Sequence, residues 1–192
     1  MSTPMGTKRA MASVQKRIDN QTQIYPPLDY SFHNAQQLED AVVEPRAPQN
    51  GPKLVKQGDR YNSYGINLNH NTLNGPLETL PDFLRTILVN PNALSTLDLS
   101  FNVFTEIPIN MLSDMTEVQK LAPLKQLKYL TLHGNPIEIT VPYLRSYILA
   151  LLPGLRSLNC TPVTKGDRKI SEVWEGMNKP LLPNYTNKKP IE

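Results

Sequence analysis

Apolar and polar residues alternate in a short pattern that recurs through the middle of this chain. Two stretches, 94–104 and 127–137, have apolar residues at relative positions 1, 4, 6 and 11 and an asparagine at position 9. Residues 66–73 repeat the pattern without its first position, and residues 155–160 contain only its beginning. Alternation with period two places apolar side chains on one face of a strand. We therefore predict a short strand in each of the four copies.

The two complete copies fit the leucine-rich repeat consensus, in which an asparagine follows the strand. Its side chain can bond backbone groups where the chain turns, so Asn71, Asn102 and Asn135 are predicted to be structural. These asparagines lie 31 and 33 residues apart, which is longer than the roughly 20–29 residues of typical repeats. The additional length has helical spacing between Leu77 and Leu88 and again between Met111 and Leu121.

This pattern predicts an α/β fold: a short right-handed leucine-rich repeat solenoid with about four parallel strands. Helices should cover its convex side. A cap should follow the last repeat, with a helical stripe of Tyr143, Tyr147, Ile148, Leu151 and Leu152. Thr164 and Asp167 then form a capping box for a final helix. Ile170, Val173, Trp174 and Met177 share one face of that helix, which either folds back onto the domain or offers Trp174 to a partner.

Four segments are predicted. Residues 1–60 form an extended arm with a short helix near 35–43, because they hold six of the 18 prolines and few large apolar residues. Residues 61–162 form the repeat domain with its cap, 163–178 the C-terminal helix and 179–192 a tail. Within the arm, an aromatic segment either docks on a partner or covers the open edge of the solenoid. Its candidate residues are Tyr25, Leu28, Tyr30 and Phe32.

Composition and charge limit the classes of ligand and the cellular locations that we expect for this chain. The net charge of +3 is spread without a basic block, so we do not expect nucleic acid as a ligand. No stretch reaches the roughly 20 apolar residues of a membrane span. Residues 1–18 have four basic and no acidic residues, which is a feature of mitochondrial presequences, but their weak amphipathicity favours a cytoplasmic protein. The single Cys160 excludes an internal disulfide and is predicted to be buried in the last partial repeat.

The predicted binding site is the concave face, built from strand side chains that point away from the core. We expect protein partners there and no small-molecule substrate. His33, His70 and His133 lack metal-ligand spacing, and no catalytic, cofactor or phosphate-binding motif is present, so we expect no metal, no cofactor and no enzymatic activity. The concave-face residues are Tyr64, Asn67, Asn69, Ser95, Thr96, Asp98, Ser100, Lys128, Tyr129, Thr131, His133, Arg156, Ser157 and Asn159.

The chain also resembles a known family. Its repeats and cap are similar to short leucine-rich repeat proteins of the phosphatase-regulator and axonemal dynein light chain type, and most of all to the leucine-rich repeat-containing protein 51 family. The more specific segments are Pro26–Phe32 and Glu172–Trp174, whereas the repeats and the cap with Val163–Arg168 are shared by many proteins. This chain departs from the family pattern by an apparent missing repeat between Asn102 and Asn135.

The resemblance implies a non-enzymatic structural adaptor in the axoneme of a cilium or flagellum, with tubulin or other axonemal proteins as partners. Two alternatives stay open. One is a soluble regulatory module of the phosphatase-regulator type. The other is a ribonucleoprotein subunit, because a spliceosomal leucine-rich protein has a similar cap.

Overall fold

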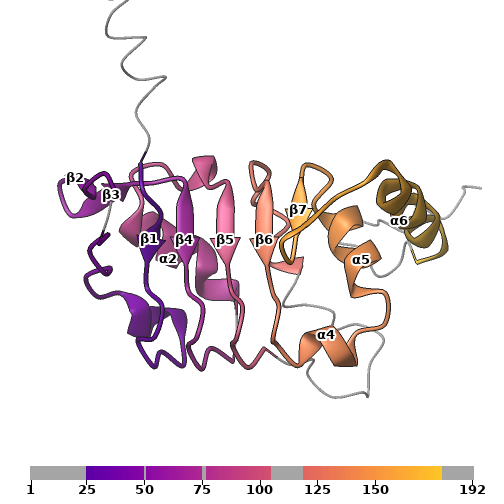
Figure 1. The fold of residues 1–192 in the computed structure, drawn as a ribbon, viewed down its shortest axis with the longest axis horizontal. Helices are drawn as coiled ribbons and strands as arrows, with labels where there is room; N and C mark the ends of the chain where they lie inside the picture. Colours follow the sequence, from indigo (N-terminus) through magenta and orange to yellow (C-terminus); the bar gives the residue numbers. More distant parts are fainter. Residues whose placement is uncertain (1–24, 50, 75–76, 105–118, 179–192) are drawn as a thin grey trace, which may run out of the picture.

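A parallel sheet forms the centre of the molecule (Figure 1). The computed structural model describes residues 25–49, 51–74, 77–104 and 119–178. The sheet has the strand order β1-β4-β5-β6-β7-β8, with the first five parallel and β8 antiparallel to β7. Strands β4 to β7 are the four that the repeats predict. The bounds are Leu28–Asp29 (β1), Gly65–Asn67 (β4), Thr96–Asp98 (β5), Tyr129–Thr131 (β6), Ser157–Leu158 (β7) and Thr161–Pro162 (β8).

The register of the strands explains the core. Ile66, Leu97, Leu130 and Leu158 are paired in one row across β4 to β7, and all four are buried. A slip of one residue would turn this row out to solvent. Each buried leucine contributes about 1.5–3 kcal/mol relative to its exposed state, so the repeated leucines determine the pairing.

The repeat asparagines bind neighbouring repeats together. The Asn102 side-chain amide donates hydrogen bonds to the carbonyls of Leu68 and Leu99, each at 3.0 Å. Its carbonyl oxygen accepts from the backbone N–H of Leu73 at 3.1 Å. Asn71 and Asn135 make equivalent bonds to their own and the preceding repeat. Each asparagine therefore satisfies buried backbone groups that no strand partner reaches.

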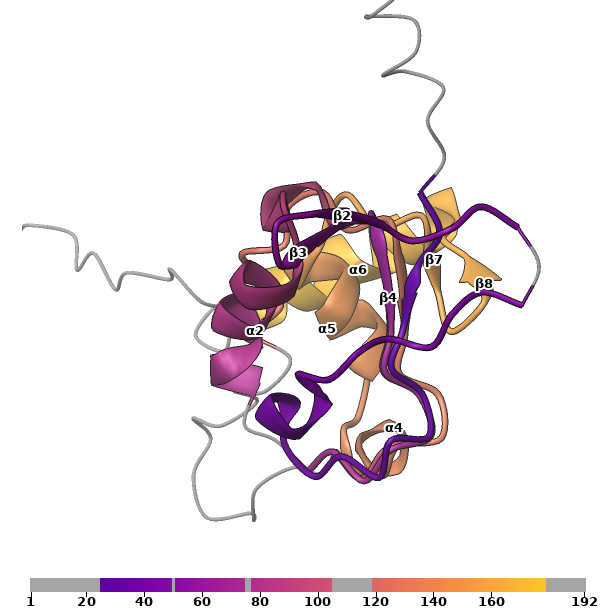
Figure 2. The same cartoon turned by 90° about the vertical axis from the view of Figure 1, so that its left-hand side faces the viewer.

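Helical turns cover one side of the sheet and leave the other side open (Figure 2). Helix α2 (Leu80–Ile87) buries Leu80, Phe83, Leu84 and Ile87, the helical spacing that the sequence predicts. It follows the 3₁₀ helix η2 (Leu77–Thr79), and a second, η3 (Pro91–Ala93), begins at the proline that ends the helical segment. The other predicted convex helix, Met111 to Leu121, lies almost entirely outside the described residues.

The N-terminal segment is part of the folded domain from residue 25 on. Leu28 and Tyr30 are fully buried, and Leu38 and Ala41 of the 3₁₀ helix η1 (Leu38–Ala41) join the same core. The hairpin of β2 (Val55–Gln57) and β3 (Arg60–Asn62) follows, and buried Tyr61 attaches it to the core. An extended arm over residues 1–60 is therefore wrong for the described residues 25–49 and 51–60. Residues 25–41 instead close the first repeat, whose core would otherwise face water.

Strand β5 pairs directly with β6, with Thr96 opposite Tyr129. The intervening chain therefore adds no strand to the sheet between these two repeats. Most of that chain, residues 105–118, lies outside the described residues.

The C-terminal cap consists of α4 (Ile137–Thr140), α5 (Leu144–Leu151) and α6 (Lys165–Met177). Tyr147, Ile148, Leu151 and Leu152 are buried as predicted, but Tyr143 is 73% exposed. Tyr143 does not belong to the stripe because it has a left-handed backbone (φ 59°) and precedes the first residue of α5.

Helix α6 folds back onto α5 through a narrow strip. Trp174 packs edge-on against Tyr147 at 5.4 Å between ring centroids, and the Ser171 hydroxyl donates to the carbonyl of Ser146 at 2.8 Å. Half-buried Trp174 is thus part of the cap, which favours the fold-back interpretation over a partner anchor. The predicted packing face is wrong in its other members, because Ile170, Val173 and Met177 remain exposed.

Cys160 is exposed, not buried as predicted. Strand β7 ends at Leu158, and Asn159 and Cys160 both have positive φ in the turn to β8. The last partial repeat therefore becomes a hairpin, and its sixth position never reaches the core.

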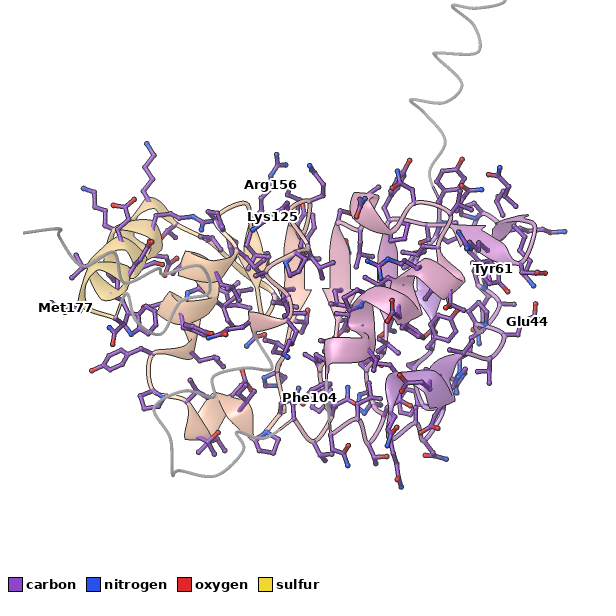
Figure 3. All side chains as sticks on the ribbon, turned by 180° about the vertical axis from the view of Figure 1, so that it is seen from behind. Glu44, Tyr61, Phe104, Lys125, Arg156 and Met177 are labelled. Atoms are coloured by element: carbon purple, nitrogen blue, oxygen red, sulfur yellow. The ribbon has the colours of Figure 1, made fainter. Side chains whose placement is uncertain are left out.

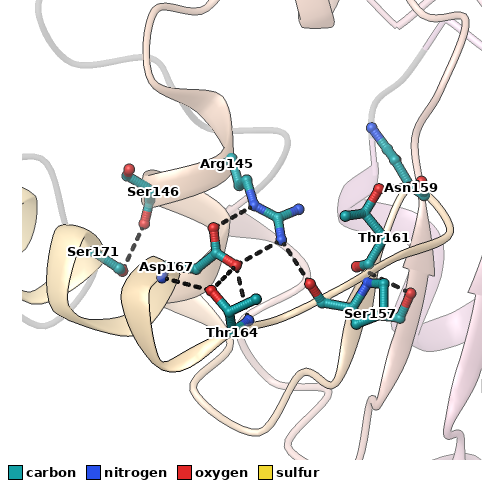
Figure 4. A network of polar contacts seen from close by, with 9 residues as sticks. Arg145, Ser146, Ser157, Asn159, Thr161, Thr164, Asp167 and Ser171 are labelled. Atoms are coloured by element: carbon teal, nitrogen blue, oxygen red, sulfur yellow. Dashed lines mark hydrogen bonds and ion pairs between the residues drawn. The ribbon is translucent and has the colours of Figure 1, made fainter.

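A polar network holds the start of α6 (Figure 4). The Thr164 hydroxyl accepts from the N–H of Asp167, and the Asp167 carboxylate accepts from the N–H of Thr164, so the capping box is formed. Arg145 of α5 donates two hydrogen bonds to the same carboxylate, each at 3.0 Å. These bonds, above all the two from Arg145, hold the pKa of Asp167 well below its usual range.

This network predicts a pH dependence of stability. Because the folded-state pKa of Asp167 is depressed, its contribution is complete above the unfolded-state pKa of about 3.9 and is lost as pH falls further. We expect wild type to lose about 1 kcal/mol more than Asp167→Asn between pH 5 and pH 2, which is the size of a helix-cap contribution. Urea unfolding at each pH measures this difference. Parallel pH profiles of the two proteins would contradict it.

Candidate functional site: the concave face

The open sheet face, opposite α2, is the predicted concave face. Two rows of side chains cross it in register. One row runs through Thr96, Tyr129 and Ser157, and the other through Asp29, Asn67, Asp98 and Thr131. Strand alternation directs these side chains away from the leucine core. The sheet thus brings residues from five chain segments onto one surface.

Hydrogen bonds fix the polar part of this face. Asn67 donates its amide to the Asp29 carboxylate at 3.2 Å, and Asn69 donates to Asp98 at 3.3 Å. The Ser100 hydroxyl also donates to Asp98, at 2.6 Å. These bonds hold the two carboxylates in place before any partner arrives, which reduces the entropy lost on binding. Sequence reasoning missed Asp29, because its strand keeps Leu28 but has Tyr30 in place of the second consensus leucine.

The two most exposed aromatic residues of this face are Tyr64, at 44%, and Tyr129, at 46%. Tyr25 lies beside Tyr64, with 5.6 Å between ring centroids. Tyr25 and Tyr64 line a hollow of about 340 Å³ together with Asn62, Ser63, Val89 and Asn90. The remaining predicted residues differ in exposure. Thr96, His133 and Arg156 are exposed, whereas Ser100 is buried and the others are half-buried, namely Asn67, Asn69, Ser95, Asp98, Lys128, Thr131, Ser157 and Asn159.

The aromatic segment of the N-terminal region divides between core and surface. Leu28 and Tyr30 are 0% exposed, so they cannot contact a partner while the domain is folded. Partner binding by these two residues is therefore wrong, and the alternative of covering the open edge describes them. Phe32 is 55% exposed and stays accessible.

A ladder of aromatic rings follows the turn end of the strands, and sequence reasoning missed it. His70 is stacked between Phe32 and Phe101, with centroid distances of 4.5 and 4.4 Å. His133 meets the edge of Phe101 at 5.3 Å. Phe32, His70 and Phe101 all have positive φ, as does Gly134 at the next equivalent position, where the Phe101 ring would lie only 2.6 Å from an added Cβ. The signal was present in the sequence, since His70, Phe101 and Gly134 each immediately precede a repeat asparagine.

Among the residues described here, no group of three or more His, Cys, Asp or Glu side chains is placed to hold a metal ion. The three histidines lie along the turn end of the strands, and His33 and His70 contact aromatic rings. Within the same described ranges, no helix is both long and apolar enough to span a membrane.

Comparison with known proteins places this architecture in a class and then in a family. The Leucine Rich Repeat family model matches residues 93–115, so this is a leucine-rich repeat protein. Leucine-rich repeat-containing protein 51 of Rattus norvegicus is 38% identical over 169 residues, which cover 80% of this chain and 86% of the relative. The chain therefore belongs to the leucine-rich repeat-containing protein 51 family, as the sequence resemblance predicted.

Two more distant similarities were found. A dynein axonemal assembly factor 1 homolog of Aedes aegypti is 33% identical over 84 residues, which cover 44% of this chain and 7% of that protein. Among solved structures, the crystal structure of the Drosophila melanogaster SNF/U2A′ complex matches with a TM-score of 0.44 and 21% identity, covering 60% of this chain and 58% of the other.

Proposed function

We propose that this protein is a non-enzymatic structural adaptor that binds protein partners through its concave face, as a component of the ciliary or flagellar axoneme. The observation that carries the binding role is the concave face itself. It presents Tyr64 and Tyr129 beside carboxylates that are already held by hydrogen bonds. Tyrosine is enriched in protein interfaces and at their energetic hot spots.

The axonemal location has separate support. The family resemblance is to axonemal leucine-rich repeat proteins, and one of the relatives found is a dynein axonemal assembly factor homolog. Tubulin and other axonemal proteins are the partners that this location offers. The segments 1–24 and 179–192 lie outside the described residues. We propose that they contact neighbouring subunits, where docking of the domain would raise their effective concentration.

The location is tested on isolated motile cilia. Membrane and matrix are removed with detergent, and the remaining axonemes are washed with salt and analysed by mass spectrometry. We expect the protein to remain with the axoneme. Release into the soluble fraction would contradict a structural role and would favour the soluble regulatory module.

The binding face is tested by Tyr129→Ala. Truncation of a hot-spot tyrosine typically costs about 2 kcal/mol or more, so we expect at least about tenfold weaker binding to the axonemal partner. Tyr143→Ala is the matched control, because Tyr143 is even more exposed but belongs to the cap. The partner is first identified by cross-linking and then purified. Its affinity for each variant is measured by surface plasmon resonance. Equal losses in the two variants would exclude a specific role for the concave face.

A further inference from the structure

Three cations gather at the edge of the sheet where strands β6 and β7 begin. Lys128 directly precedes β6, Arg156 directly precedes β7, and Lys125 lies three residues before Lys128. The backbone N–H of Arg156 donates to the carbonyl of Lys128 at 2.7 Å, so their backbones are adjacent. Figure 3 shows Lys125 and Arg156 at the same edge of the molecule, projecting from the ribbon. We name Lys125, Lys128 and Arg156 the basic edge.

The basic edge has no acidic partner in the described part of the chain. The ion pairs found there join other residues, such as Arg145 with Asp167 and Lys56 with Glu44. Other arginines nearby are occupied, since Arg145 binds Asp167 and Arg168 donates to the carbonyls of Leu149 and Leu155. Within the described residues, nothing neutralises the three cations of the basic edge, and this suits them to an external anion.

The wider distribution of charge points the same way. The described residues up to 104 contain eight Asp and Glu against five Lys and Arg, a net charge of −3. Those from 119 to 178 contain four against eight, a net charge of +4. Over the described residues the two halves of the solenoid thus carry opposite charge, and the basic edge lies in the positive half; residues 105–118, outside them, add three acids and no base. An anionic partner would be attracted to this half.

We propose that the basic edge binds an acidic segment of a protein partner, with Tyr129 as the adjoining aromatic contact. This rests on the proposed function, whose concave face includes Tyr129. Tyr129 is 46% exposed and directly follows Lys128. Neighbouring strands are about 4.8 Å apart, so one short segment running across the edge meets Lys128 and Arg156 in succession. Carboxylates at alternate positions of an extended peptide lie about 6.6 Å apart, and the long side chains of lysine and arginine can span the difference.

A protein ligand fits this surface better than a nucleic acid. A polyanion that continued across the sheet would meet the carboxylates of Asp98 and Asp29, both fixed on the same face. Three cations also neutralise few phosphates, and nucleic-acid affinity depends on the number neutralised. A short acidic segment can end before it reaches these carboxylates.

The test uses the purified full-length chain and a fluorescein-labelled peptide of eight glutamates, with binding followed by fluorescence anisotropy at about 50 mM salt, where the charges are weakly screened. We expect the triple variant Lys125→Gln, Lys128→Gln, Arg156→Gln to bind at least about tenfold more weakly, a modest loss for each exposed charge contact. The control triple Lys53→Gln, Arg60→Gln, Arg85→Gln removes the same charge from the other half and should keep the wild-type affinity.

Three results would overturn the proposal: equal binding of an eight-glutamine peptide, an equal loss in the control triple, or tighter edge-dependent binding of an eight-nucleotide single-stranded RNA. The assay needs no axoneme, so its outcome is independent of the proposed location. If the peptide result holds but the protein leaves the axoneme in the salt wash, the acidic segment belongs to a soluble partner. If the protein is retained on the axoneme but wild type and the basic-edge triple variant bind the peptide equally, only this inference fails.

Discussion

Replacing Asn102 with alanine is expected to lower the free energy of unfolding by about 3 kcal/mol. The side chain is 3% exposed and forms hydrogen bonds with backbone groups of Leu68, Leu73 and Leu99. Alanine would leave the buried Leu73 N–H without a partner, which costs about 1–3 kcal/mol. The carbonyls of Leu68 and Leu99 would keep hydrogen bonds from Asn71 and Asn135, so each bond lost there costs only about 1 kcal/mol. The loss should appear in urea unfolding as a lower midpoint with an unchanged slope.

The matched control for this substitution is Asn92→Ala. Asn92 is exposed in the 3₁₀ helix η3, and exposed substitutions of this kind usually change stability by less than about 0.5 kcal/mol. If Asn102→Ala lowers the free energy of unfolding no more than the control does, the repeat asparagines do not hold the repeats together. Asn102→Asp distinguishes the contribution of the amide oxygen from that of the amide NH₂ group, because aspartate keeps an acceptor for the Leu73 N–H but has no donors.

The sequence predicts the repeats well because each copy encodes its own strand. The alternation of Leu97 and Leu99, or of Leu130 and Leu132, allows only one face to be buried. The asparagine then marks the turn. Stacking of identical patterns leaves few choices of register, so the order of β4 to β7 follows from the chain. The rows of the concave face follow as well, because they are the residues between the leucines.

The ends of the solenoid are less predictable because they replace consensus residues. In β1, Tyr30 occupies the position of the second leucine and His33 that of the asparagine, as the pairing of Leu28 with Ile66 shows. A two-residue strand of this kind carries almost no periodic signal. At the other end, Cys160 occupies the consensus position of the second strand leucine, but it lies in the turn of the hairpin between β7 and β8. There the contacts of β8, which lie outside the repeat, decide the conformation.

The aromatic ladder shows a second limit. Each repeat contributes only one ring to the ladder, so a repeat considered alone shows no stacking. The stacking of His70 between Phe32 and Phe101 exists only when three repeats lie side by side. Contacts between equivalent positions of different repeats must therefore be sought by aligning the copies, and Phe32 enters that alignment only after β1 is known to be a repeat strand.

Tyr30→Ala is expected to lower the free energy of unfolding by about 4 kcal/mol, as for other large-to-small substitutions in a core. Tyr30 is fully buried, and its ring meets Phe83 of α2 at 6.0 Å between centroids. Its hydroxyl is buried too, without a hydrogen-bond partner among the described residues, and burial raises the pKa of this phenol. The aromatic ring, not the hydroxyl, should therefore supply the stability.

Tyr30→Phe makes that distinction. Because it removes a buried hydroxyl that has no partner, it should leave stability unchanged or raise it by about 1 kcal/mol. Phe32→Ala, two residues away and exposed, should cost about 1 kcal/mol or less, the value of an aromatic stacking contact. All three variants are compared by urea unfolding. If residues 25–32 were instead a partner-binding arm, Tyr30→Ala would cost no more than Phe32→Ala. A large loss confined to Tyr30→Ala would show that the segment completes the fold, which leaves the concave face and the basic edge free for partners.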